Sequence, residues 1–250
     1  MKKFIAYFDY LGFKQFIENN DLQYQKRIIG NIFRDIEDAL GQGKMKEAKI
    51  GVIADLKDSR INCINFSDTI VFWTNDDSEE SLMELIKVAY RFNRQTVIHF
   101  FPARGALVYG EINYVDFKQH NDAGGLYNIN SVFGKGLVEA HEKAEKQHWA
   151  GTVIDSTLIN ELIKRNYKVD SFLLPYTKKY KVPYKKEPEL LEEYVLNLVK
   201  GNLNNDGLKN GKNMILRNFS NHNKSVDKQD VKEKIENTLK FLESYYKNED

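Results

Sequence analysis

A charge at the mouth of an apolar strand is the feature that most constrains this chain. Residues 69–73 (TIVFW) are β-branched and aromatic, which predicts a buried strand, and Asp68 stands directly before them in a short polar turn. A carboxylate at the edge of an apolar strand is costly unless a partner compensates its charge. The fold must therefore supply such a partner near Asp68.

A second apolar stretch, residues 4–10, carries a matching feature. Asp9 lies at its end, and Gly12 and Phe13 follow at once in a predicted tight turn. Two strand-end carboxylates beside such turns could hold two hard cations, while turn amides cradle phosphate oxygens. The alternative is that each aspartate only forms or caps a turn, as a lone aspartate at a strand end usually does.

Composition narrows the class of protein. The chain has 250 residues and a formal net charge of +1, so no bulk field favours nucleic acid or a membrane as partner. Its single cysteine, Cys63, excludes an intrachain disulfide framework and a multi-cysteine zinc site. No apolar run is long enough to span a bilayer, and a predicted strand, not a signal peptide, begins the sequence. We therefore expect a cytoplasmic protein without a nucleic-acid or membrane partner.

Periodicity predicts the order of the secondary-structure elements. Strands are predicted at residues 3–10, 50–56, 61–65, 69–73, 103–109, 112–118, 126–133, 151–154 and 192–199, and helices at 21–41, from about 78 to at least 97, and at 134–147, 156–165 and 227–247. This order predicts an α+β fold, a ferredoxin-like βαββαβ unit with helices on one face of its sheet. We expect a core over residues 1–167 and a C-terminal extension over 168–250.

Two polar stretches in the extension carry weaker signals. Lysines alternate with tyrosines between Tyr176 and Lys186. Such a run could bind phosphate or nucleic acid, but it is more typical of a solvated loop. The stretch 202–225 is rich in asparagine and lysine, which indicates a loop or a frayed helix.

Several motifs, in order, resemble the class III nucleotide cyclases. Residues 8–13 (FDYLGF) are similar to the F-D-I-x-G-F opening of that family, and Asp68 stands where its second metal aspartate stands. Residues 104–111, 133–140 and 151–155 resemble later signatures, so the match covers roughly residues 3–165. The segments 66–71 (FSDTIV) and 104–106 (RGA) are most similar to the pyrimidine cyclases of the bacterial Pycsar anti-phage defence systems.

The resemblance implies an activity and a metal site. The expected reaction is metal-dependent conversion of a nucleoside triphosphate to a 3′,5′-cyclic monophosphate and pyrophosphate. Asp9 and Asp68 would hold two Mg²⁺ or Mn²⁺ ions, with the Tyr10 carbonyl as a further ligand. Amides near Gly12 and Phe13 would cradle the triphosphate. The product would be a second messenger that a separate effector protein senses.

The resemblance also implies a head-to-tail homodimer with active sites at the interface. Strands 69–73 and 104–109 are apolar on both faces, so the sheet face opposite the helices needs cover. A twofold dimer is the commonest way to provide it.

The chain departs from the family at its third helix. Common relatives carry an asparagine and an arginine there that stabilise the transition state, and the aligned residues here are Val138 and Glu142. Arg104, Lys135 or Lys143 could supply charge instead, and of these we expect Arg104 to be catalytic. A catalytically silent homology domain that binds a nucleotide or a partner therefore stays open. Another palm-type nucleotidyltransferase is a second alternative, although the G-G-[DE]-E-F-like turn of dinucleotide cyclases is absent.

The substrate base follows from two further positions. Purine-using relatives read adenine with a lysine and an aspartate, and the aligned residues here are Ile64 and Ser131. These would leave the adenine edge poorly matched, so a pyrimidine is expected, with UTP favoured over CTP. Lys185 and Lys186 precede the 192–199 strand, where the family places a phosphate-binding lysine.

Overall fold

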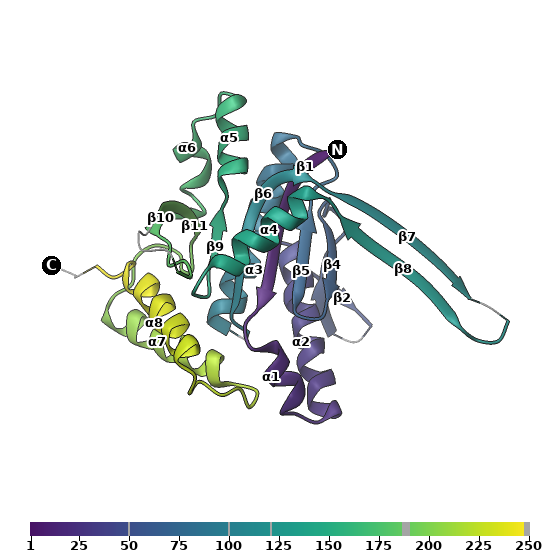
Figure 1. Cartoon of the computed structure of the whole chain (residues 1–250), viewed down its shortest axis with the longest axis horizontal. Coiled ribbons are helices and arrows are strands. Elements are labelled where there is room, and N and C mark those ends of the chain that lie inside the picture. The colour runs from purple at the N-terminus through teal and green to yellow at the C-terminus, as the bar shows by residue number, and fades with distance from the viewer. Residues whose placement is uncertain (50, 100, 121, 187–190, 248–250) are drawn as a thin grey trace.

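The computed structural model describes residues 1–49, 51–99, 101–120, 122–186 and 191–247. Figure 1 shows how the helices and strands are arranged around a central sheet. In chain order the described elements are β1 (Lys2–Tyr10), α1 (Phe13–Glu18), α2 (Leu22–Leu40), β2 (Met45–Ala48), β3 (Gly51–Ala54), β4 (Asn62–Phe66), β5 (Thr69–Trp73), α3 (Glu79–His99), β6 (Ala103–Glu111), β7 (Asn113–His120), β8 (Leu126–Phe133), α4 (Lys135–Lys146), β9 (Thr152–Ile154), α5 (Ser156–Lys164), α6 (Val169–Leu173), β10 (Thr177–Lys181), β11 (Glu192–Leu196), α7 (Asn205–Ser220) and α8 (Gln229–Glu243).

The central sheet has the predicted ferredoxin-like core. Within the described residues its strand order is β10-β11-β9-β6-β1-β5-β4. In the row β6, β1, β5 and β4, each strand is antiparallel to its neighbour, as a βαββαβ unit requires. Beyond them, β9 runs parallel to β6, and β11 and β10 continue the sheet in antiparallel pairs. The predicted α+β fold class is confirmed.

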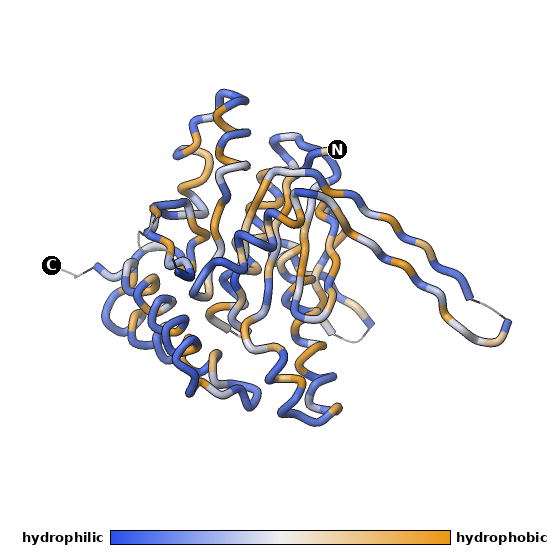
Figure 2. Tube along the Cα trace, viewed as in Figure 1, coloured by the Kyte–Doolittle hydropathy of each residue, from blue (hydrophilic) through white to orange (hydrophobic). Residues whose placement is uncertain are grey.

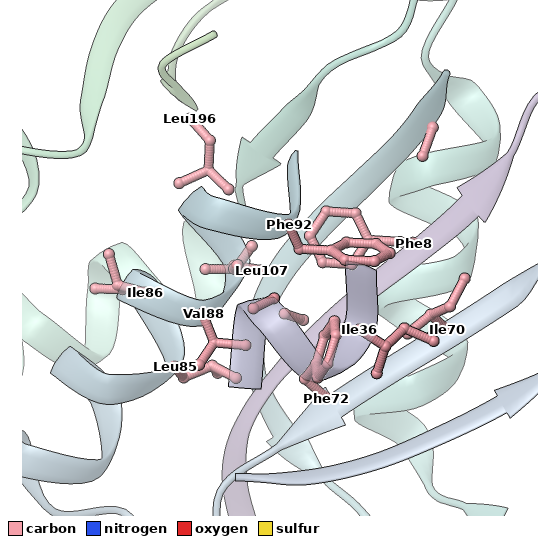
Figure 3. Close-up of a cluster of buried hydrophobic side chains, with 14 of the residues drawn as sticks. Phe8, Ile36, Ile70, Phe72, Leu85, Ile86, Val88, Phe92, Leu107 and Leu196 are labelled. Carbon is pink, nitrogen blue, oxygen red and sulfur yellow. The ribbon is translucent and has the colours of Figure 1, made fainter. Parts of the chain in front are cut away.

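Helices α2 and α3 pack on one face of this core. Ile28, Ile32 and Ile36 recur at intervals of four residues, so they share the buried side of α2. Figure 3 shows the aromatic centre of this face, where Phe8 and Phe72 from the sheet contact Phe92 of α3. Their ring centroids lie 4.8 and 5.3 Å from that of Phe92, in edge-on geometries that favour aromatic pairing.

Helix α4 covers part of the opposite face. Ala140 and Ala144 are fully buried against Ile5 and its sheet neighbours. Small residues permit this close approach, since a Cβ atom added to Gly110 of β6 would lie 2.5 Å from the Cα atom of Gly136. The chain itself therefore covers much of the face that we expected a second subunit to cover, and the area over β5 and β4 is left for a cavity.

The segment after α6 forms more regular structure than the sequence predicted. The lysine–tyrosine run contributes β10, not a solvated loop, because Tyr180 stacks on the buried Trp149 with ring centroids 5.5 Å apart. Residues 205–220 form the regular helix α7, which buries Ile215 and Phe219 beside α8. A loop or a frayed helix was predicted here, and the regularity of α7 was not foreseen because its apolar residues are spaced among several asparagines.

Strands β7 and β8 form a long hairpin that projects from the body of the molecule (Figure 1). Apolar and polar residues alternate along both strands, as the tube in Figure 2 shows. Large apolar side chains stay exposed on it: Tyr114, Val115, Phe117, Leu126, Tyr127, Ile129 and Phe133. An isolated hairpin of this kind is marginally stable in water, so this arm is a candidate contact surface. In the part of the chain that the structure describes, no helix has the length and hydropathy needed to cross a membrane.

Candidate active site

The two predicted carboxylates meet at one end of the sheet. Asp9 lies opposite Thr69 in the β1–β5 register, and the amide of Tyr10 donates to the carbonyl oxygen of Asp68 at 2.9 Å. Ser67 adopts a left-handed conformation with φ 57°, which closes the β4–β5 turn and places Asp68 at the start of β5. The pairing of β1 with β5 thus brings together two aspartates that are 59 positions apart in the sequence.

Arg104 is the cation beside Asp9. It lies opposite Asp9 in the β1–β6 register, with Nη2 2.8 Å and Nε 3.0 Å from Asp9 Oδ2. The same guanidinium also donates to the side chain of Glu145 on α4 and, at 3.3 Å, to the main-chain oxygen of Glu145. Burial raises the pKa of Asp9, the charge of Arg104 lowers it, and the charge of Asp68 raises it again. Asp68 is therefore near enough to repel Asp9.

The two lysines predicted to bind phosphate, Lys185 and Lys186, differ in their position relative to the site. Lys185 Nζ lies 3.4 Å from Glu145 Oε2, so its ammonium stands on the far side of the same carboxylate that contacts Arg104. Burial lowers the pKa of Lys185, and the charge of Arg104 lowers it further. Lys186 has its side chain exposed and a positive φ of 62°. Lys185 thus joins the charged cluster, whereas no contact of Lys186 with that cluster is found among the described residues.

A cavity of about 810 Å³ opens on the α4 side of the sheet. Its walls come from β1, β4, β5, the base of the β7–β8 arm and α4. Ile64 and Ser131, the two positions expected to meet the substrate base, both line it. The other lining residues are Tyr7, Cys63, Asn65, Phe66, Thr69, Val71, Tyr114, Asn130, Val132, Leu137, Val138 and His141. A cavity of this volume is large enough for a nucleotide base with its ribose.

Tyr7 connects this cavity with the carboxylates. Its hydroxyl lies 3.0 Å from Nδ1 of His141 and 3.4 Å from Oγ1 of Thr69, the residue that follows Asp68. Burial raises the pKa of Tyr7, its contact with Thr69 lowers it, and the charge of Asp9 raises it. Tyr7 lines the cavity, contacts His141 and interacts electrostatically with Asp9. The cavity and the charged cluster therefore form one continuous site.

Two predicted site residues, Tyr10 and Phe13, have side chains buried in the core, which leaves only their main chain for the expected roles. The Tyr10 side chain points into the α2–α3 core, where its hydroxyl is buried and has no hydrogen-bond partner among the described residues. Phe13 is buried against Phe16 and Phe101. Gly12 takes a positive φ of 81° at the turn, where a side chain would be strained. A carbonyl at residue 10 and amides at 12 and 13 remain compatible with the expected roles.

The residues of α4 that align with the family's transition-state pair, or that could replace it, lie in different places. The side chain of Val138 is 56% exposed and lines the cavity, because α4 leaves this part of the sheet uncovered. Lys143 pairs with Glu193 at 2.7 Å, and Lys135 borders a separate surface hollow beside Lys2. Neither lysine is among the residues that line the cavity.

Sequence reasoning missed His141 and Glu145. Both follow Val138 at helical spacing, at three and seven positions, so they lie on one stripe of α4. Given the position of Val138, this spacing could have indicated both. The stripe runs from the cavity to Arg104.

The residues present fit a divalent cation held between Asp9 and Asp68. No group of three or more histidine, cysteine, aspartate or glutamate side chains that could hold a metal is found in the described part of the chain. Asp9 and Asp68 are, however, hard oxygen donors, which Mg²⁺ and Mn²⁺ prefer. The charge of Asp68 raises the pKa of Asp9, and a cation between the two would relieve this repulsion.

Comparison with known proteins supports the fold. Neither the known family models nor the curated protein sequences match this chain. Among solved structures, the guanylate cyclase domain of RhGC from Catenaria anguillulae in complex with GTP is similar, with a TM-score of 0.52 and 9% identity, covering 80% of this chain and 97% of that one. The non-canonical dimeric guanylyl cyclase domain of the RhoGC fusion protein from Blastocladiella emersonii has a TM-score of 0.51 and 8% identity, covering 78% and 95%. The chain therefore has the fold of a nucleotide cyclase catalytic domain.

Proposed function

We propose that this chain, which has a nucleotide cyclase fold, is a metal-dependent cyclase that converts a pyrimidine nucleoside triphosphate to its 3′,5′-cyclic monophosphate and pyrophosphate. The observation that carries the proposal is the meeting of Asp9 and Asp68 at the end of the sheet beside a cavity of about 810 Å³. A purely structural role would leave two repelling carboxylates at this edge unexplained.

For this reaction the chain must bind a base, orient a ribose, hold a triphosphate and keep the reacting groups in line. The ribose 3′-oxygen bonds to the α-phosphorus as the bond to pyrophosphate breaks. A divalent ion would lower the pKa of the 3′-hydroxyl and offset the phosphate charge. Asp9 and Asp68 would hold it, Arg104 orients Asp9, and Lys185 offers positive charge toward the phosphates.

The cavity walls support a pyrimidine as the base. Ile64 supplies no hydrogen bond, and the Ser131 hydroxyl is short. The amide of Asn130 is already engaged with Tyr114 and Asn128. An adenine would leave its amino group and ring nitrogen with few partners, and each unpaired group costs about 1–3 kcal/mol. We favour UTP over CTP as the substrate. As the resemblance to anti-phage pyrimidine cyclases implies, the product would be a second messenger that a separate effector protein senses.

A homodimer completes the proposal. The β7–β8 arm exposes apolar side chains, and its base forms one wall of the cavity. Phe66 and Val138 at the rim of the cavity are also exposed. A second copy that buries these surfaces would close the cavity at a subunit interface. The guanylyl cyclase domain of the Blastocladiella emersonii protein is dimeric, which is consistent with this arrangement.

A silent homology domain is the second candidate. The observation in its favour concerns the two α4 residues that align with the family's transition-state asparagine and arginine. Val138 is apolar, and Glu142 is exposed and acidic, so neither can stabilise a phosphorane. The test is incubation of the pure protein with equal ATP, GTP, CTP and UTP and Mn²⁺, with products identified by mass spectrometry. Cyclic UMP or CMP should dominate, with cyclic UMP ahead. A dominant cyclic purine overturns the base assignment, a linear or cyclic dinucleotide favours another nucleotidyltransferase, and no product favours the silent domain.

A further inference from the structure

Four charged side chains of alternating sign form a row at the edge of the site. Asp9 of β1, Arg104 of β6, Glu145 of α4 and Lys185 each contact the next. The first three come from different elements, and Lys185 follows β10, so the row exists only in the folded chain. Resemblance and sequence pattern assign no role to Glu145, although it is the only member that contacts both cations.

Each nitrogen of the Arg104 guanidinium makes a hydrogen bond. Nε donates to Asp9 Oδ2, Nη2 donates to the side chain of Glu145 and Nη1 to its main-chain oxygen, and Nη2 also forms an ion pair with Asp9 Oδ2. The side chain of Arg104 is 9% exposed. Because this guanidinium is buried and already hydrogen-bonded, it acts on Asp9 and is poorly available to a phosphate.

Glu145 therefore decides how strongly Arg104 holds Asp9. A cation bound to Asp9 must compete with the guanidinium of Arg104 for the same carboxylate. The negative charge of Glu145 attracts that guanidinium as well, which weakens its attraction to Asp9. If Glu145 were lost or shortened, Arg104 would be neutralised by Asp9 alone. The carboxylate of Asp9 would then be less available to a metal ion.

We propose that Glu145 is a positioning residue that sets the cation affinity of Asp9 through Arg104. The inference rests on the proposed role of Asp9 as a metal ligand. It concerns the chain before any nucleotide binds, so it can be tested without turnover. The measurement is the binding of Mn²⁺ alone, which is monitored by the loss of the free-ion signal in electron paramagnetic resonance.

Two variants separate positioning from simple electrostatics. Glu145→Gln removes the charge, and Glu145→Asp keeps the charge but withdraws it by one methylene from Arg104. We expect both to raise the Kd for Mn²⁺ by roughly three- to tenfold. Glu139→Gln, an exposed glutamate of the same helix, is the control and should leave the Kd unchanged. Thermal unfolding without metal checks that all variants are folded.

The outcomes distinguish this inference from the proposed function. If Glu145→Asp binds Mn²⁺ as the wild type does while Glu145→Gln binds it more weakly, only the field of Glu145 matters and the positioning role is wrong. If both match the wild type, the inference fails as well. If Asp9→Asn itself leaves Mn²⁺ binding unchanged, the metal site fails, and the proposed function fails with it.

Discussion

Arg104 faces Asp9 across the β1–β6 pair, and its Nη2 lies 2.8 Å from Asp9 Oδ2. Within the described residues, no comparable ion pair reaches Asp68. The two aspartates therefore differ in how the protein itself compensates them. Asp9 is part of a mostly buried ion pair, whereas Asp68 stands in a turn and relies on solvent or a bound cation.

This difference predicts two distinct outcomes for the same substitution. Asp9→Asn and Asp68→Asn should each lower turnover more than a hundredfold, because each removes an anionic ligand. Only Asp9→Asn should also lower the free energy of unfolding, by about 1–3 kcal/mol, because it weakens the partner of a buried guanidinium. Turnover with Mn²⁺ and urea denaturation measure the two effects. Near-normal activity in either variant would remove that residue from the metal site.

The cavity predicts that a bulky side chain at its wall blocks the nucleotide. Ile64→Trp should weaken nucleotide binding at least tenfold while changing the thermal midpoint little, because the cavity of about 810 Å³ accepts the indole. Val52→Trp on the exposed hairpin strand β3 is the control and should bind normally. Equilibrium dialysis with radiolabelled UTP gives the affinities. Undiminished binding by Ile64→Trp would place the base elsewhere.

Asp35 of α2 predicts a pH dependence of stability. Burial, with a smaller effect from the charge of Asp38, raises the pKa of Asp35 from 3.8 to about 7. The folded state thus keeps a proton that the unfolded chain releases, so this contribution to stability is present below about pH 4 and is lost as pH rises to about 7. Asp35→Asn stays neutral at every pH. Its free energy of unfolding should therefore increase relative to that of the wild type across this pH window, by at most about 4 kcal/mol.

Urea denaturation at several pH values between about 4 and 8 tests this. The gain of Asp35→Asn over the wild type should grow through the window and become constant above it. Asp58→Asn, an exposed carboxylate, should show no such trend. A difference that is independent of pH would mean that Asp35 is charged in the folded protein.

The turn at Gly12 predicts a coupling to Lys224. An alanine there would adopt an unfavourable φ of 81° and bring its Cβ to 2.9 Å from Cδ of Lys224. Gly12→Ala should destabilise the fold by about 1–2 kcal/mol. It should cost less in a Lys224→Ala background, because the contact is then gone and only the backbone strain remains.

A matched glycine provides the control. Gly30 of α2 has open space around its Cα, so Gly30→Ala should stabilise the protein by about 0.5–1 kcal/mol. Denaturant unfolding gives the free energies of unfolding of the single and double variants, from which a double-mutant cycle is built. Additive effects of Gly12→Ala and Lys224→Ala would show that the two residues do not interact.

The exposed arm predicts how the proposed homodimer can be broken. Phe117 on β7 is 48% exposed and lies 5.5 Å from Tyr127, ring centroid to centroid, so Phe117→Asp should not disturb the body of the protein. It should convert a dimer into a monomer at micromolar concentration and lower activity. Val52→Asp is the control. Sedimentation velocity gives the assembly state, and an active wild-type monomer would overturn the dimer proposal.

The sequence by itself determined the fold class and the strand-end carboxylates. Period-two and period-3.6 patterns are local, and the stretches 4–10 and 69–73 contain enough apolar residues to specify strands without knowledge of their neighbours. In the sequence, Gly12 follows the first of these stretches and Ser67 precedes the second. The proximity of Asp9 to Asp68 could be predicted because a ferredoxin-like order makes β1 and β5 neighbours, with Asp9 opposite Thr69.

Only the tertiary structure decided which side chains complete the site. Glu145 reaches Arg104 because the paired glycines 110 and 136 let α4 approach the sheet closely, and no local pattern encodes that distance. Lys185 joins the row while Lys186 does not, since a backbone with φ 62° follows at Lys186. The strand β10 formed where a solvated loop was predicted because Trp149, distant in sequence, gives Tyr180 a surface to stack on. Contacts of this kind depend on packing between elements, and packing is set by the whole chain at once.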